Sequence, residues 1–158
     1  MIALATAFVM TLCTTIAWRL GQAGRFQSEV ALLGNARRHP GGLAVRIARG
    51  GEVAGAIQWH AEDEPDYRHA GIDIYMDPTL HGRGLGTDAV RTLARHLIAD
   101  GGHHRLVIDP AADNTAAIRC YSKVGFRPVG VMRRYERGQD GTWHDGLLMD
   151  LLADELIT

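Results

Sequence analysis

The central part of the chain alternates between strand-like and helix-like apolar patterns, and this alternation restricts the fold more than any other feature. Over residues 70–76 the apolar side chains recur at every second position, as in a half-buried strand. Over 84–99 they recur at spacings of three and four, which is typical of one helix face: Val90, Leu93, Ala94, Leu97 and Ile98. A short apolar strand at 105–108 and a second helix from Asn114 to Val124 are expected next. This order predicts a mixed α/β sheet whose middle strands run parallel.

Two hairpins are expected on either side of this central run. They pair residues 43–49 with 52–60, and 128–136 with 143–152. The turn residues Gly50-Gly51 and Asp140-Gly141 connect the strands of each hairpin. Gly125 is expected to end the second helix in a left-handed conformation.

Length and composition indicate one compact domain, because 158 residues suffice for one sizeable core and are too few for two ordinary ones. A formal net charge of -1 argues against a general nucleic-acid binder. Cys13 and Cys120 fit neither a disulfide framework nor a paired metal motif, and the histidines show no zinc spacing. We therefore expect a cytoplasmic protein without a metal.

The first 42 residues lack the pattern of the rest. Residues 1–18 carry no charged side chain, which leaves a secretory signal, a membrane anchor, a buried helix or an ill-defined leader as alternatives. No basic residue precedes Arg19, and threonines dilute the apolar run, so we favour the last two and expect no membrane association. We divide the chain into an atypical, partly apolar segment, 1–42, and a core, 43–158.

The segment from His81 to Thr87 is the most informative for function, because it joins the strand at 70–76 to the following helix. Its sequence is His-Gly-Arg-Gly-Leu-Gly-Thr. Closely spaced glycines let successive N–H groups point at one anion, and the helix N-terminus adds its positive end, so a pyrophosphate would be held here. The alternative is a flexible turn. Neither the Walker nor the Rossmann pattern is present.

This segment resembles the signature of the GNAT acetyltransferases, Gln/Arg-x-x-Gly-x-Gly/Ala. His81-x-x-Gly84-x-Gly86 departs from it only at the first position. A second stretch, Asn114-x-x-Ala117-Ile118-x-x-Tyr121-x-Lys123-x-Gly125-Phe126, is similar to the family's fourth helix and following strand. The resemblance covers residues 43 to about 153, and within the family the chain looks closest to bacterial aminoglycoside 6'-N-acetyltransferases. It implies a mixed, centrally splayed sheet flanked by helices, and acetyl-CoA as acyl donor.

The resemblance also implies which residues contact the donor. The end of the strand would pair with pantetheine and the loop would bind the pyrophosphate through its main chain, while the second helix would line the same site. The residues are Ile74, Tyr75, Met76, Arg83, Gly84, Leu85, Gly86, Thr87, Asn114, Ala117, Tyr121 and Lys123.

An acceptor amine requires a base, because an amine resembling lysine has a pKa near 10.4 and its neutral form costs roughly 4 to 5 kcal/mol at neutral pH. Asp73 lies mid-strand, where a carboxylate is costly unless it faces a wet cleft. By its match to the Gly-Ile-Asp of aminoglycoside acetyltransferases, Asp73 would bind the ammonium and accept its proton; the alternative is an exposed residue or a salt bridge. Asp109 would be a second acceptor-binding carboxylate, or simply a strand-ending turn residue.

Tyr121 is the candidate general acid for the departing CoA thiolate, with a core tyrosine as the alternative. The family's direct attack on the thioester forms no acyl-enzyme, so Cys120 is expected to be structural. The acidic stretch 62–66 either attracts a polycation or is simply solvated.

We therefore expect an acetyl-CoA-dependent N-acetyltransferase acting on a primary amine of a small cationic substrate, with the 6'-amino group of an aminoglycoside favoured. A protein N-terminus, a lysine or a metabolite amine is one alternative acceptor class. A non-catalytic acyl-CoA-binding module is the other alternative. A monomer or a homodimer is expected.

Overall fold

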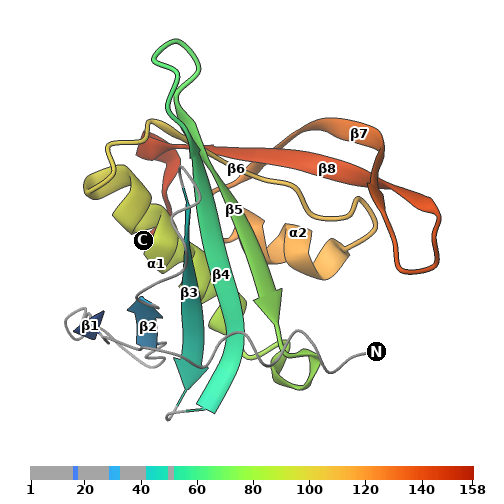
Figure 1. The fold of residues 1–158 in the computed structure, drawn as a ribbon, viewed down its shortest axis with the longest axis horizontal. Coiled ribbons are helices and arrows are strands. Elements are labelled where there is room, and N and C mark those ends of the chain that lie inside the picture. The colour runs from blue at the N-terminus through green and yellow to red at the C-terminus, as the bar shows by residue number, and fades with distance from the viewer. Residues whose placement is uncertain (1–15, 18–28, 33–41, 50–51) are drawn as a thin grey trace.

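A mixed eight-stranded sheet with two α-helices forms the described part of the molecule (Figure 1). The computed structural model describes residues 16–17, 29–32, 42–49 and 52–158, and the side chains from 53 onward. Most of the segment 1–42, with the apolar stretch considered above as a signal or anchor, lies outside the described residues. Within the described part of the chain, no helix is both long and apolar enough to cross a bilayer.

The strands are ordered β1-β2-β3-β4-β5-β6-β8-β7 in the sheet. Only β5 and β6 pair in parallel, and every other neighbouring pair is antiparallel. The strand bounds are β1 Ile16–Ala17, β2 Glu29–Leu32, β3 Gly42–Arg49, β4 Glu52–Glu62, β5 His69–Met76, β6 Arg105–Ile108, β7 Arg127–Arg137 and β8 Trp143–Leu152. Both expected hairpins and the parallel middle pair are confirmed.

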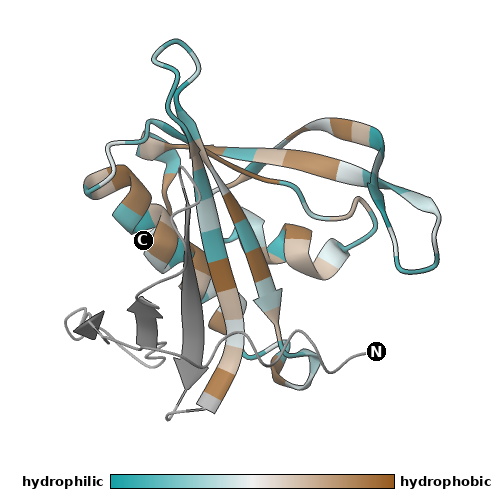
Figure 2. Cartoon of the chain, in the orientation of Figure 1, coloured by the Kyte–Doolittle hydropathy of each residue, from teal (hydrophilic) through white to brown (hydrophobic). Residues whose placement is uncertain are grey.

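Helix α1 (Leu85–Ala99) packs its apolar face against the sheet. The buried residues of the helix follow the expected spacing: Leu85, Ala89, Val90, Leu93, Ala94 and Leu97. The partners of this face in the core include Ile57, Ile72 and Leu106 from the middle strands. Figure 2 shows apolar residues on α1 and on the middle strands, whereas the loop between β4 and β5 is hydrophilic. The acidic stretch 62–66 is exposed in that loop.

Helix α2 (Thr115–Ser122) is shorter at its C-terminal end than the sequence indicates. Asn114 is its N-cap, as expected, and the Asn114 side chain accepts a hydrogen bond from the amide of Ala117 at 3.1 Å. The helix was expected to continue to Val124, but the amides of Val124 and Phe126 both bond to the carbonyl of Tyr121, which closes a tighter turn. Gly125 follows with φ 118°.

The central strands pair over very different lengths, and this splays the sheet. β4 and β5 are in register from Gly55↔Met76 to Glu62↔His69. β5 and β6 pair only at Ala70↔Leu106 and Gly71↔Val107. Figure 1 shows the two strands diverging beyond this point. From residue 72 to 76, β5 therefore has no described strand on its β6 side, and the expected central splay is confirmed.

The short elements complete the described chain. The 3-10 turn η1 (Pro78–Leu80) connects β5 to the loop before α1, and η2 (Ala153–Glu155) follows β8. The carbonyl of Glu155 lies close to Gly125, so η2 packs against the turn after α2. Because a Cβ on Gly125 would lie 2.4 Å from that carbonyl oxygen, only glycine fits this contact.

Replacing Gly125 by alanine should destabilise the fold. Both the φ of 118° and the backbone contact oppose a Cβ, so we expect the free energy of unfolding to fall by about 2–4 kcal/mol in urea denaturation. Gly130→Ala is the matched control, since an added Cβ meets nothing within 4 Å there. Equal stability of the two variants would contradict this account of the turn.

Candidate acetyl-transfer site

The loop before α1 has the backbone geometry of an anion cradle. Gly82 and Gly84 adopt φ values of 75° and 81°, in the region that favours glycine. An added Cβ at either glycine would enter open space. Gly84 is also the N-cap of α1, and the first N–H groups of a helix have no partner within it. The amides around Arg83–Thr87 thus lie at a positive helix end with an open approach.

His81 connects this loop to the end of β5 through a hydrogen bond. Its Nε2 hydrogen-bonds with the carbonyl oxygen of Met76 at 3.2 Å. Asp77 starts η1 by accepting hydrogen bonds from the Thr79 hydroxyl and amide, each at 2.8 Å. The same two hydrogen bonds lower the pKa of Asp77. The Arg83 guanidinium donates to the Thr79 carbonyl at 3.4 Å. These contacts place the loop directly after the unpaired stretch of β5.

Thr87 and Cys120 join the N-terminal turn of α1 to α2. The Thr87 hydroxyl and the Cys120 thiol form a hydrogen bond of 3.1 Å. Burial raises the pKa of the Cys120 thiol, which keeps it in its neutral, unreactive form near neutral pH. Gly86 lies against Cys120, where an added Cβ would meet the sulfur at 3.6 Å. The cysteine therefore serves as packing between the helices.

The four α2 residues expected at the donor site are distributed along the helix. Asn114 is exposed at the N-cap, Ala117 is half-buried one turn later, and Lys123 is exposed at the C-cap. Tyr121 is buried, with 8% of its surface exposed, and its ring packs edge-to-face on Phe126. Burial, with smaller contributions from Cys120, Asp109 and Asp73, raises the pKa of Tyr121. Its phenol is therefore protonated throughout the neutral pH range.

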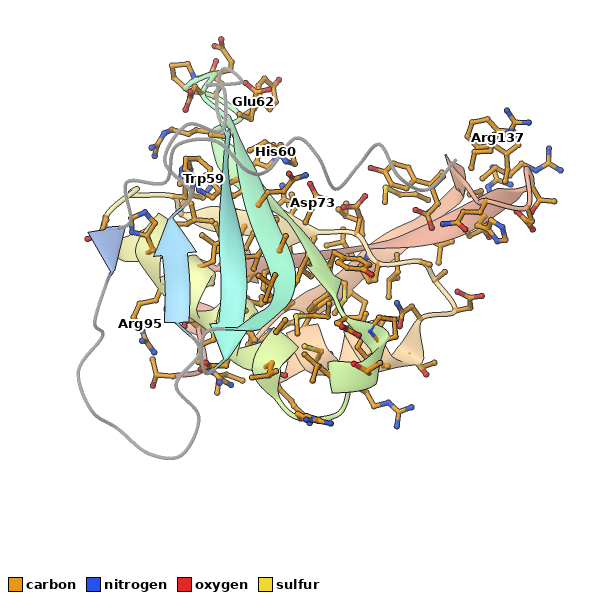
Figure 3. The ribbon with its side chains drawn as sticks, turned by 60° about the horizontal axis from the view of Figure 1, so that its bottom comes forward. Trp59, His60, Glu62, Asp73, Arg95 and Arg137 are labelled. Carbon is orange, nitrogen blue, oxygen red and sulfur yellow. The ribbon has the colours of Figure 1, made fainter. Side chains whose placement is uncertain are left out.

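Asp73 is exposed on β5, opposite Gln58 of β4. Gln58 Nε2 donates a hydrogen bond to Asp73 Oδ2 at 3.2 Å. The pair lines an open hollow of about 260 Å³ together with Ala56, Ile57, Ile74 and Tyr75. In the view of Figure 3, Asp73 lies between β5 and the β7–β8 hairpin. The carboxylate therefore faces solvent, as a group that must meet a substrate ammonium would.

Asp109 is half-buried and lies just after β6. Both Asp73 and Asp109 act on the pKa values of Tyr121 and Tyr135, which places the four groups near one another. The Asp109 carboxylate, as an acceptor for the Tyr135 hydroxyl, is the main cause that raises the pKa of Tyr135 to about 12.

Sequence reasoning missed two of these residues, Gln58 and Tyr135. The alternating pattern of 52–60 puts Gln58 on the exposed face, but only the pairing register sets it opposite Asp73. Nothing in the sequence of the second hairpin separates Tyr135 from any other exposed strand residue. Among the described side chains, no three metal-ligating groups gather in one place.

Comparison with known proteins shows that the chain is similar in sequence to several acetyltransferases. The chain is 39% identical over 75 residues to the aminoglycoside N(6')-acetyltransferase type 1 of Klebsiella pneumoniae. These aligned residues cover 47% of this chain and 36% of that protein. The chain is 36% identical over 73 residues to the N-alpha-acetyltransferase RimI of Mycobacterium tuberculosis, covering 46% of this chain and 44% of that one. The chain thus spans less than half the length of either relative.

Solved structures show the same fold. Mycobacterium smegmatis RimJ in complex with CoA-disulfide superposes with a TM-score of 0.70 at 29% identity, over 77% of this chain and 57% of that one. The family model described as acetyltransferase (GNAT) family matches residues 11–126, which is most of the chain. The splayed sheet, the glycine loop and these matches agree, and the chain belongs to the acetyltransferase (GNAT) family.

Proposed function

We propose that the chain is an acetyl-CoA-dependent N-acetyltransferase that acylates a primary amine of a small cationic substrate, with the 6'-amino group of an aminoglycoside as the favoured acceptor. One observation carries this proposal. The unpaired edge of β5 leads directly into the amide-lined loop at the N-terminus of α1, and the same strand presents an exposed carboxylate, Asp73. A donor site and an acceptor site thus share one strand.

The described residues fit coenzyme A. The N–H groups of residues 83–87 would hold the diphosphate at the helix end, and Arg83 adds a cationic side chain beside them. Along Ile74, Tyr75 and Met76, the backbone groups that point away from β4 would pair with the amides of pantetheine as an added strand would. Open space at Gly82 and Gly84 leaves room for phosphate against the backbone. When bound, acetyl-CoA supplies an acetyl group activated as a thioester.

The acceptor side is acidic. Asp73 would bind the substrate ammonium and take its proton, which is required because the neutral amine is scarce at neutral pH. Asp109 adds a second carboxylate that acts on the same tyrosines as Asp73, and two negative groups near one another raise the local concentration of a polycation. This charge and the aminoglycoside-acetylating relative together support an aminoglycoside. RimI supports a peptide N-terminus as the alternative acceptor.

Tyr121 is suited to donate a proton or a hydrogen bond to the departing thiolate. Its raised pKa keeps the phenol protonated, and the preceding residue of α2, Cys120, bonds to Thr87 at the end of α1 that carries the loop. Cys120, next to it, has a raised pKa as well and is bonded to Thr87, so it is a poor nucleophile. Direct attack of the amine on the thioester therefore needs no acyl-enzyme.

A thiol-release assay tests the proposed function. The purified chain is given acetyl-CoA and one of three acceptors: kanamycin, a peptide with a free N-terminus, or spermidine. Release of CoA with kanamycin above the other two supports the aminoglycoside acceptor. Preference for the peptide indicates that a protein N-terminus, and not an aminoglycoside, is the acceptor. Binding of CoA without turnover on any amine contradicts an enzyme and indicates an acyl-CoA-binding module.

Gly84→Ala should weaken CoA binding in addition to a modest loss of folding stability. The φ of 81° costs alanine about 1 kcal/mol of folding free energy, while the new methyl group enters the space that the diphosphate would fill. We expect at least a tenfold loss of CoA affinity by calorimetry. Gly102→Ala is the control, because it has a φ of 64°, the same open surroundings and a place in the turn after α1. Similar CoA affinities for the two variants would place the diphosphate elsewhere.

Asp73→Asn should abolish most turnover without affecting the donor. The amide still accepts the hydrogen bond from Gln58 but has neither charge nor basicity, so kcat/KM for the amine should fall by about 10²–10⁴. The affinity for CoA should be unchanged. Asp154→Asn removes one negative charge from an exposed position in η2 and serves as the control. Full activity of Asp73→Asn would exclude Asp73 as the base.

A further inference from the structure

The pairing of β7 with β8 is interrupted between Pro128 and Gly130 and, over a longer stretch, between Met132 and Glu136. Met132 pairs with Gly146, and the next pair is Glu136 with His144. Residues 133–135 of β7 therefore lie opposite Asp145 alone. We call this interruption the β7 bulge. Bulges bend a strand and turn a side chain in a new direction, and they are common beside active sites.

Asp145 holds the bulge in an unfavourable backbone conformation. Arg134 has a φ of 52°, the one positive φ at a non-glycine position within the described residues. Its amide donates a hydrogen bond of 2.7 Å to Asp145 Oδ1. A left-handed conformation costs an ordinary residue roughly 1–2 kcal/mol, and a short bond to a carboxylate offsets this cost. The bulge is thus held by a specific contact.

Gly146 provides the surface on which the bulge rests. A Cβ there would lie 2.9 Å from Tyr135 Cδ1 and 3.2 Å from Met132 Cε, so both side chains pack over this glycine. On its other edge, β8 bonds to the segment that follows Asp109. The amide of Ala112 donates to the carbonyl of Asp145, and the amide of Leu147 donates to the carbonyl of Pro110, each at 2.8 Å. Tyr135 is thereby brought across β8 toward Asp109.

We propose that Tyr135 positions the Asp109 carboxylate in the acceptor site, and that the β7 bulge sets the direction of the Tyr135 side chain. Its ring packs over Gly146, where β8 bonds to the segment that follows Asp109, so the Tyr135 hydroxyl would donate to the Asp109 carboxylate. This bond would fix the carboxylate and leave its remaining lone pairs for the substrate ammonium. The half-exposed ring of Tyr135, with 50% of its surface accessible, borders the same approach. This inference rests on the proposed function, because it concerns how that acceptor site holds its cation.

The first experiment measures kanamycin affinity on the CoA-loaded protein by calorimetry, and KM and kcat where turnover occurs. Tyr135→Phe should raise Kd and KM for kanamycin about tenfold, the loss expected for one hydrogen bond to a charged group. kcat and the affinity for CoA should be unchanged. Tyr67→Phe, at an exposed loop tyrosine, is the control. Unchanged kanamycin affinity in Tyr135→Phe would overturn the proposal.

A double-mutant cycle tests whether Tyr135 acts through Asp109. In an Asp109→Asn background, Tyr135→Phe should change kanamycin affinity by no more than about twofold, because interacting residues are not additive. A full tenfold loss in that background would show that Tyr135 acts independently, which contradicts the positioning role.

Two variants of Asp145 test the bulge itself. Asp145→Ala removes the acceptor for the Arg134 amide and should weaken kanamycin binding as much as Tyr135→Phe does. Asp145→Asn retains a carbonyl oxygen at that position and should retain most of the affinity. An asparagine variant as impaired as the alanine variant would contradict this role of Asp145.

An ultraviolet titration tests the hydrogen bond without any substrate. The difference between wild type and Tyr135→Phe gives the ionisation of this phenol, which is expected at a pKa of about 12. Asp109→Asn should lower it toward the ordinary tyrosine value of about 10. An ordinary pKa in the wild type would overturn the inference even if acetylation is observed. Conversely, a raised pKa with no acetylation of any amine would leave the Tyr135–Asp109 pair intact and refute the proposed function alone.

Discussion

The limited pairing between β5 and β6 is the constraint on which the rest of the structure depends. A parallel pair that continued along β5 would use the backbone groups of residues 72–76 in the sheet and leave none for a ligand. The pairing stops after Gly71↔Val107, so one edge of β5 is available along the stretch that ends at the glycine loop. The antiparallel pairing with β4 continues on the other edge as far as Met76. The splay therefore opens a site without loosening the strand that carries it.

The helix end that meets this strand is held from two sides. His81 bonds to the carbonyl of Met76, so the departure from the family's first signature position still fastens the loop to the strand. On the other side, Thr87 bonds to Cys120 of α2. A cradle made of main-chain amides depends on backbone position more than on side-chain identity, and these two contacts supply that position. The thiol is consequently part of the packing, in agreement with its raised pKa.

Charge is divided across the site in a way that suits amine acylation. Under the proposed function, Arg83 and the helix end would lie on the donor side, and Asp73 and Asp109 would lie where the acceptor approaches. Both carboxylates have a neutral hydrogen-bond donor beside them, Gln58 for Asp73 and Tyr135 for Asp109. A neutral donor orients a carboxylate without cancelling its charge, so the negative field on the acceptor side is preserved.

Local patterns in the sequence determined the start of both helices, the strands from residue 43 onward, the glycine loop and the caps at Asn114 and Gly125, because periodicity and turn chemistry depend on neighbours within a few residues. They did not indicate β1 and β2. On the same local basis, the motif resemblance added the family, which the comparisons confirm, and the prediction of a donor site. Tertiary structure alone decided the opposition of Gln58 and Asp73 and the β7 bulge beside Asp145. Each of these depends on the register or packing of segments distant in the chain. A shift of one residue in a strand reverses every side chain, so local patterns do not determine such contacts.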